Sequence, residues 1–311
     1  MQIGEKMTKR KYNKANYQPS ITKEDGLKKL EEGIKNLVNS ARWKEYLLVQ
    51  SKFRDYSFNN VMMILLQYPN ATQVTGYGTW KKLGRYVKAD APLTLFGEKG
   101  IRIWAPMTKK ETKEDEVTGE EIEKTIIAGF KLVSVFDISQ TDGKPLPEIT
   151  NKLAGESELY QKALNRCPFP VEEVSNLNGA NGSFTHTTNS IKILSSLSEA
   201  HKLKTLIHEW GHGLLHKRDG KEPLVNKEVR ELEAESVAFV VCNALGLDSA
   251  DYSFGYLASW GNGENAIELI KLSAKRIQQA SSTILETINT ENTKKIEDHT
   301  TISEPSLVEV A

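Results

Sequence analysis

The sequence predicts an α+β protein of two domains. Its 311 residues are long enough for two domains. Helical patterns come first, strand-like alternation fills residues 72–140, and a second set of helices follows residue 150. Residues 1–110 hold 21 Lys and Arg against 9 Asp and Glu, a net charge of +12, and residues 111–311 carry −12. We expect a basic tail (1–20), an N-terminal helix-plus-β-sheet domain (21–145), a second α+β domain (150–288) and a polar, acidic tail without regular structure (289–311).

Each domain has its own order of elements. In the first, we expect helices over Asp25–Leu37 and from Trp43 to about Gln67, then strands over 72–140, interrupted by a charged hairpin loop over Lys109–Lys124. Pro145 and Pro147 mark the linker. In the second, we expect a helix near Glu156–Arg166, strands around Gly182–His186 and Ser190–Leu194, a helix through residue 208, and helices over Asn226–Leu245 and Glu264–Leu285.

The pattern His208-Glu209-Trp210-Gly211-His212 has the HExxH spacing of a zinc site. Residues four apart lie on one face of a helix, so two imidazoles can share one tetrahedral metal beside the glutamate between them. Zinc lowers the pKa of a bound water, and Glu209 can take its proton. Two patterns predict a helix here. Apolar residues recur at helical spacing (Leu203, Leu206, Ile207 and Leu214), and the capping-box pair Ser196 and Glu199 stands just before them.

A third metal ligand is expected from the following helix, which is rich in glutamate. At about 100° per residue, Glu231 and Glu235 share one face and Glu233 points nearly the opposite way. An unpaired buried carboxylate is costly, so Glu231 and Glu235 on an apolar helix are candidate ligands, whereas Glu233 is assigned to a solvated face. His216, one turn beyond His212, is a further candidate.

Composition excludes several classes of protein. Hydrophobic content of 39% and charged content of 26% are ordinary for a soluble protein. No apolar run is long enough to span a membrane, and the basic start has no signal-peptide core, so we expect a cytoplasmic protein without a membrane partner. The two cysteines, Cys167 and Cys242, are expected to be buried thiols.

The basic half suggests a nucleic-acid partner. Residues 76–106 interleave aromatic and cationic side chains on segments whose alternation suggests strands. Aromatics that stack on bases beside cations that follow phosphates would suit single-stranded DNA, although buried aromatics of a small β-rich domain give the same pattern. The candidate DNA-binding residues are Trp80, Lys81, Lys82, Arg85, Lys99 and Arg102.

The metal motifs resemble a known group. The HExxH segment followed by Glu231-Leu-Glu-Ala-Glu235 resembles glutamate-type zincins of the ImmA/IrrE kind and the metallopeptidase half of ArdC-type antirestriction proteins. The resemblance covers residues 150–280 and implies that Glu231 is the third ligand and that Glu235 orients a histidine. A metzincin would need a histidine where this chain has Arg218.

The N-terminal half is similar to the single-stranded-DNA-binding domain of the same ArdC-type proteins, over residues 30–141. Its motifs are Tyr56-Ser-Phe-Asn-Asn60, Gly76-Tyr-Gly-Thr-Trp-Lys-Lys-Leu-Gly-Arg85, Gly97-Glu-Lys-Gly-Ile101, Ile103-Trp-Ala-Pro106 and Val135-Phe-Asp-Ile-Ser-Gln-Thr141. The family joins its Val-Lys step almost directly to Gly-Glu-Lys-Gly, whereas residues 89–96 intervene here.

Together, the resemblances imply an antirestriction protein of a mobile genetic element that binds single-stranded DNA and has a zinc metallopeptidase domain. His208, His212 and Glu231 would hold zinc, Glu209 would act as general base, and a peptide substrate would pair with the edge of the strand at 190–194. One alternative is a regulatory zinc protease that cleaves a transcriptional repressor. The other is a DNA-binding protein with an inactive zincin domain, against which the intact Glu209 weighs.

Overall fold

The computed structural model describes residues 22–95, 99–114, 121–146, 156–216, 226–247, 254 and 264–290. The expected tails lie almost wholly outside these residues, as do Thr118-Gly119 in the middle of the expected hairpin loop and Pro147 of the expected linker. In the first half the elements are α1 (Lys23–Lys35), η2 (Asn36–Val38), α2 (Ser40–Lys52), α3 (Phe58–Gln67), β1 (Val74–Gly76), α4 (Tyr77–Lys82), β2 (Arg85–Val87), β3 (Ile101–Glu114), β4 (Glu121–Asp137), η3 (Ile138–Gln140) and β5 (Thr141–Gly143). The second half contains α5 (Glu156–Arg166), β6 (Val171–Val174), β7 (Gly182–Thr185), β8 (Ser190–Leu194), α6 (Glu199–Leu215), α7 (Lys227–Ala244) and α8 (Glu264–Asn289).

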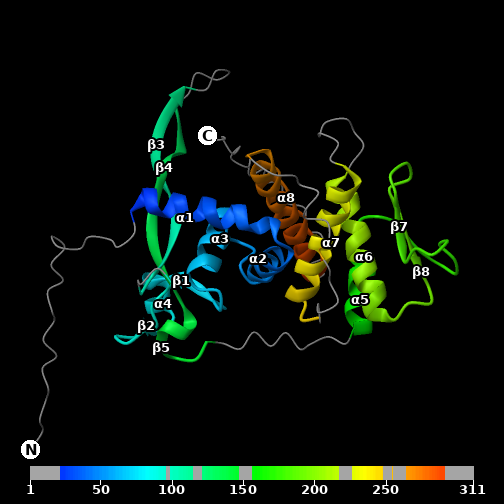
Figure 1. The fold of residues 1–311 in the computed structure, drawn as a ribbon, viewed down its shortest axis with the longest axis horizontal. Helices are drawn as coiled ribbons and strands as arrows, with labels where there is room; N and C mark the ends of the chain where they lie inside the picture. Colours follow the sequence, from blue (N-terminus) through cyan, green and yellow to red (C-terminus); the bar gives the residue numbers. More distant parts are fainter. Residues whose placement is uncertain are drawn as a thin grey trace, which may run out of the picture.

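The N-terminal half is a twisted sheet in the order β1-β4-β3, with helices against it (Figure 1). Two side-chain amides of α3 occupy the outer edge of β3. The Asn60 amide donates to Trp104 O at 2.9 Å and accepts from Trp104 N at 2.8 Å. Gln67 does the same for Arg102, donating to its O at 2.8 Å and accepting from its N at 2.9 Å. These hydrogen bonds pair backbone N–H and C=O groups that an edge strand would otherwise leave without a partner.

Three expectations for this half are corrected. The single helix from Trp43 to Gln67 is two helices, because the turn after Phe53 folds α3 back onto α2 and buries its apolar side chains. The segment 77–82 is a short helix instead of a strand, with one side chain, Trp80, turned into the core. Most of the charged stretch Lys109–Lys124 is strand, since β3 and β4 pair as far as Glu114 and Glu121.

In the second half, α6 lies against a small sheet of order β6-β8-β7, and α5, α7 and α8 pack around α6 away from that sheet (Figure 1). The predicted helix at Glu156–Arg166 is confirmed, and the strands at 182–185 and 190–194 are found where they were expected. Helix α6 begins at Glu199 and its N-cap is Ser198, whose side chain accepts from His201 N, so the expected capping box that starts at Ser196 is wrong by two residues. Strand β8 lies between β6 and β7, so it has no free edge and the peptide-pairing expectation for 190–194 is wrong.

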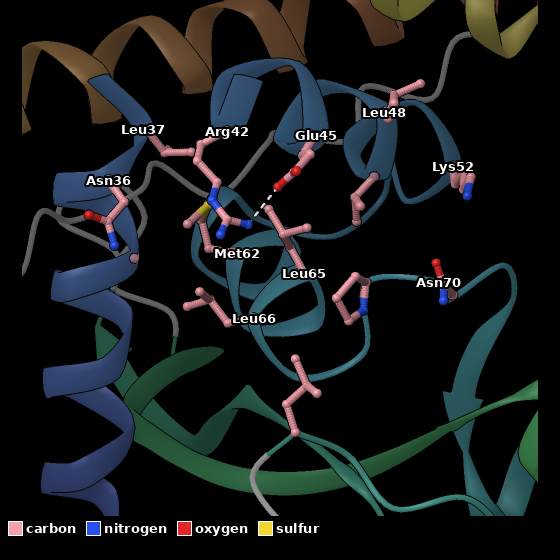
Figure 2. A pocket seen from close by; sticks show the side chains of 14 residues that line it. Asn36, Leu37, Arg42, Glu45, Leu48, Lys52, Met62, Leu65, Leu66 and Asn70 are labelled. Atoms are coloured by element: carbon pink, nitrogen blue, oxygen red, sulfur yellow. Dashed lines mark hydrogen bonds and ion pairs between the residues drawn. The ribbon is translucent and has the colours of Figure 1, made fainter. Parts of the chain in front are cut away.

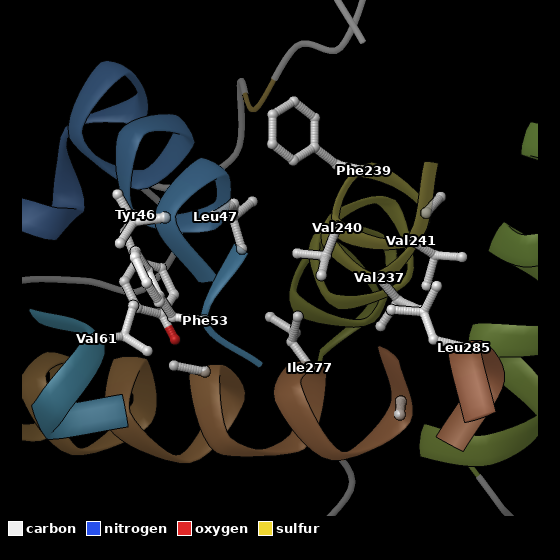
Figure 3. Packing of buried hydrophobic residues seen from close by; sticks show 14 of the residues in the cluster. Tyr46, Leu47, Phe53, Val61, Val237, Phe239, Val240, Val241, Ile277 and Leu285 are labelled. Atoms are coloured by element: carbon white, nitrogen blue, oxygen red, sulfur yellow. The ribbon is translucent and has the colours of Figure 1, made fainter. Parts of the chain in front are cut away.

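One hydrophobic core runs through both halves. Figure 3 shows Tyr46 and Leu47 of α2 facing Val240 of α7, with Ile277 of α8 closing the space between them. Within this core, Trp43 Nε1 donates to Ser236 Oγ at 3.0 Å. The mixture of helices and sheets in N- and C-terminal parts is as predicted, while the domain boundaries at 145 and 150 stay a prediction. Among the described residues, no helix is both long and apolar enough to cross a membrane.

Candidate metal centre

Helix α6 holds the two motif histidines on a rigid support. Leu203, Leu206 and Trp210 are fully buried on the side that packs against the rest of the domain. A Cβ on Gly213 would lie 2.6 Å from the rings of both Phe169 and Phe184, a distance that real Cβ contacts do not reach. The small sheet and its neighbouring loop therefore approach this helix closely at Gly213.

Three predicted ligand atoms converge at one point. His208 Nε2 and His212 Nε2 are 3.1 Å apart, and Glu231 Oε2 is 3.5 Å from each. Ligand atoms about 2.0–2.1 Å from a tetrahedral zinc lie roughly 3.3 Å from one another. Two imidazole nitrogens and one carboxylate oxygen at these spacings fit such an ion, and they leave a fourth position open.

The other ring nitrogen of each histidine also has a partner. His208 Nδ1 lies 3.1 Å from Glu235 Oε2, the contact that the sequence suggested for Glu235. Lys204 Nζ lies 3.3 Å from the second oxygen of that carboxylate. On the other side of the site, His212 Nδ1 is 3.0 Å from His216 Nδ1, so His216 contacts a ligand histidine without facing the metal position itself.

Glu233 is the main error of the sequence interpretation. It is 0% exposed instead of solvated, and its Oε2 is 2.9 Å from His216 Nε2. The signal was present in the sequence, because α7 has apolar residues on both faces, which is typical of a helix buried all round. The His212-to-His216 spacing of one helical turn could likewise have indicated that the two rings touch.

The electrostatics of the metal-free site follow from these contacts. Burial lowers the pKa of His208, but hydrogen bonds with Glu231 and Glu235 outweigh it and raise that pKa to about 9. The hydrogen bonds from His208 and His212 hold the pKa of Glu231 far below its ordinary value. A metal ion must therefore displace a proton from His208 when it binds.

Glu209 is placed to act as a base. Its side chain is buried, and burial raises its pKa, while the two motif histidines and a backbone hydrogen bond from Phe184 act in the opposite direction. A Cβ on Gly182 would lie 3.0 Å from Glu209 Oε1 and 2.4 Å from Thr205 Cγ2. Strand β7 thus lies directly against the base, with no room for a side chain between them.

The candidate DNA-binding residues fall into two groups, three that donate hydrogen bonds within the N-terminal half and three exposed lysines. Trp80 is 2% exposed and its Nε1 donates to Phe136 O at 2.9 Å, so the expectation that its ring stacks on a base is corrected: it is a core residue. Arg85 donates to Thr141 and to Lys144 O, and Arg102 donates to Ser134 Oγ at 2.7 Å. Lys81, Lys82 and Lys99 are exposed, although Lys99 Nζ donates to Ala89 O.

Two exposed tyrosines of the interleaved segment are not among the candidate DNA-binding residues named from the sequence. Tyr77, on α4, is 54% exposed and Tyr86, on β2, is 57% exposed. Tyr77 and Lys81 are four residues apart on α4 and so share a face of that helix. Both tyrosines lie in the interleaved segment, but alternation alone did not show which of its aromatics point outward.

A separate groove of about 660 Å³ lies between α1, α2 and α3 (Figure 2). Its walls are mostly apolar, with Leu37, Met62 and Leu65 among them, and the Arg42–Glu45 ion pair of 2.8 Å lies at its side. It contains none of the residues of the metal centre.

Comparisons with known proteins match two segments of the chain to different domain families. The family model for the N-terminal domain of anti-restriction factor ArdC matches residues 23–136, and the model for the IrrE N-terminal-like domain matches residues 168–243. The chain thus joins a segment similar to the ArdC N-terminal domain to a segment similar to the IrrE N-terminal-like domain, in that order. The crystal structure of the Mn(II)-bound antirestriction protein ArdC from plasmid R388 has the same fold, with a TM-score of 0.51 and 21% identity over 85% of this chain and 99% of that one.

The chain is also similar to a curated protein. It is the uncharacterized protein pXO2-81 of Bacillus anthracis, 25% identical over 77% of this chain. The match spans only 46% of that relative, so this chain corresponds to about half of the longer protein.

Proposed function

We propose that this chain is an antirestriction protein that binds single-stranded DNA through its N-terminal half and hydrolyses peptide bonds at a zinc ion in its C-terminal half. The observation that carries the enzymatic part is the convergence of His208 Nε2, His212 Nε2 and Glu231 Oε2 within 3.1–3.5 Å of one another. Two imidazoles and a carboxylate with an open fourth position are the ligand set of catalytic zinc in thermolysin-like enzymes.

The chain's own groups can supply the remaining chemistry. When bound, zinc would lower the pKa of a coordinated water and polarise the peptide carbonyl. Glu209 takes the proton from the attacking water and later donates it to the leaving amine. Its buried position, which raises its pKa, suits a group that must both accept and return a proton near neutral pH. Glu235 holds the ring of His208 through Nδ1.

A substrate strand would pair with β7 and not with β8. Strand β7 is at the edge of the small sheet and lies against Glu209 at Gly182. A peptide that adds to this edge places its backbone over the metal position, and main-chain hydrogen bonds fix its direction.

Metal analysis of the purified full chain tests the site. We expect about one zinc per chain in the wild type, none after His212→Ala, and a full complement after Glu209→Gln, because Glu209 is not a ligand. Loss of zinc from Glu209→Gln would contradict the role of base. Peptidase activity is then measured by mass spectrometry of protein substrates incubated with wild type and with Glu209→Gln as the matched inactive control.

The DNA-binding part rests on the exposed aromatic and basic groups of α4 and β2. Tyr77 and Tyr86 replace Trp80 as the rings on which bases stack, and Lys81 and Lys82 supply charge beside them. Phosphate contacts release counterions, so affinity should fall steeply with salt.

Fluorescence anisotropy of a labelled oligonucleotide on the full chain measures this binding. Tyr77→Ala and Tyr86→Ala should each cost about 1–3 kcal/mol of binding free energy if the rings stack. Phe130→Ala is the matched control, since Phe130 is 44% exposed on β4, outside the proposed surface. Equal affinities for all three variants would remove both tyrosines from the interface.

The same assays separate the alternatives. Specific cleavage of a transcriptional repressor by the wild type, without affinity for oligonucleotides, favours the regulatory protease. Binding of DNA with a loaded but unreactive metal centre favours an inactive zincin domain.

A further inference from the structure

We propose that His216, Glu233 and Arg276 form a buried chain of contacts that fixes the orientation and tautomer of the metal ligand His212. This inference rests on the proposed function and extends it from the metal ligands to the residues that hold one of those ligands in place. The observation is a continuous series from α6 through α7 to α8: His212 Nδ1 to His216 Nδ1 at 3.0 Å, His216 Nε2 to Glu233 Oε2 at 2.9 Å, and Glu233 Oε2 to Arg276 Nη2 at 3.6 Å.

The direction of every hydrogen bond in the series follows from the metal position. His212 presents Nε2 to the site, so a neutral ring must carry its proton on Nδ1 and donate it to His216 Nδ1. His216 then accepts through Nδ1 and carries its own proton on Nε2, which it donates to the Glu233 carboxylate. This single pattern serves both rings, and it leaves His212 Nε2 free to bind a metal.

The burial of the polar side chains in this series indicates a role beyond packing. His216 and Glu233 are both buried, and Glu233 Oε1 has no hydrogen-bond partner in the part of the chain that the structure describes. A buried carboxylate that is only partly satisfied opposes folding. An apolar pair of similar shape would pack without this cost. The charge of Glu233 is therefore best explained by its link, through His216, to the imidazole of His212.

The series is also anchored at its far end. Arg276, on α8, donates through Nη2 to Leu215 O, the last residue of α6, immediately before His216. Helix α8 therefore contacts both the carboxylate and the chain segment that positions the second histidine. On the opposite side of the site, His208 has one carboxylate, Glu235, in the equivalent place.

Zinc affinity of the full chain, measured by competition with a chromophoric chelator, tests the proposal. In the double variant His216→Phe/Glu233→Gln, which removes the His216 imidazole and the Glu233 charge together, affinity should fall about 10–100-fold. The single variant Glu233→Gln should lose less, because the amide oxygen still accepts from His216 Nε2. His201→Phe, also on α6 but outside the series, is the matched control and should match the wild type.

Thermal unfolding of each metal-free variant separates this role from a structural one. A group that matters only for packing would lower the unfolding temperature and leave the affinity of the folded protein unchanged. Affinity within about twofold of the wild type in the folded double variant would overturn the proposal, and if that variant does not fold, unchanged affinity in Glu233→Gln overturns it. A wild-type chain that binds no zinc would instead refute the metal centre itself.

Discussion

The free energy of unfolding of Gly213→Ala, compared with that of the matched variant Gly211→Ala, measures how tightly the small sheet packs against α6. Both glycines are inside the same helix, so each substitution gains about 1 kcal/mol of helix propensity. They differ in what the new Cβ meets. At position 211 it makes ordinary contacts of 3.5 Å with Val237, whereas at position 213 it lies 2.6 Å from two aromatic rings.

Those rings have little freedom to move away. Phe169 and Phe184 pack edge to face, with centroids 5.1 Å apart, and Phe184 also belongs to β7. Overpacking of this kind costs about 1–3 kcal/mol. Since the propensity gain cancels between the two variants, Gly213→Ala should be less stable than Gly211→Ala by about 1–3 kcal/mol.

Denaturant unfolding of the metal-free full chain, followed by circular dichroism, gives both free energies of unfolding. Gly211→Ala should be as stable as the wild type or up to about 1 kcal/mol more stable. Equal stability of the two alanine variants would refute the reasoning, because it would mean that β7 and the Phe169 loop do not press on the helix at this position.

Three further outcomes are expected. Glu231→Gln should abolish zinc binding measured by chelator competition, whereas Glu235→Gln should weaken it by about 10–100-fold, and reversal of this order would exchange their roles. Trp80→Phe should lower the unfolding free energy by about 0.5–1.5 kcal/mol by removing the hydrogen bond from Nε1 to the Phe136 carbonyl, with DNA affinity of the folded protein unchanged. Burial raises the pKa of the Cys167 thiol from 9.0 to about 11. The native thiolate is thus about a hundredfold scarcer at pH 8, and iodoacetamide should react correspondingly more slowly than with unfolded protein.

The pKa shift of Cys167 also has a consequence for stability. The folded state has the higher pKa, so it binds its proton more tightly than the unfolded state does. The stability that this thiol contributes is present in full below pH 9 and is lost as the pH rises from about 9 towards 11.

The sequence could predict what depends on local spacing. His208 and His212 are placed by the helical repeat alone, and Asn226 and Gly246 mark the two ends of α7 as their side-chain and backbone preferences indicate. The strands at 182–185 and 190–194 are likewise predicted by the pattern of residues within each strand. These features require only the residues of one element.

What the sequence could not predict depends on partners far along the chain. The apolar residues on both faces of α7 indicate that Glu233 is enclosed, but its partners His216 and Arg276 come from other parts of the chain and only the packing of α7 shows them. Trp80 and Tyr77 belong to one short helix, yet only the position of β4 decides that the first is covered and the second exposed. The central position of β8 likewise depends on β6, which has no clear alternation of its own.

The core shared by both halves has a consequence for the order of folding. Trp43 meets Ser236 across 193 residues, and Gln278 of α8 donates to the backbone of Arg54 across 224 residues. Contacts so distant along the chain are slow to form, because a long loop must close before they stabilise anything. During synthesis α2 emerges long before α7 and α8, so its apolar side chains stay uncovered until most of the chain has left the ribosome. We expect early intermediates of this protein to bind hydrophobic dyes and chaperones, and to mature only after α8 has been made.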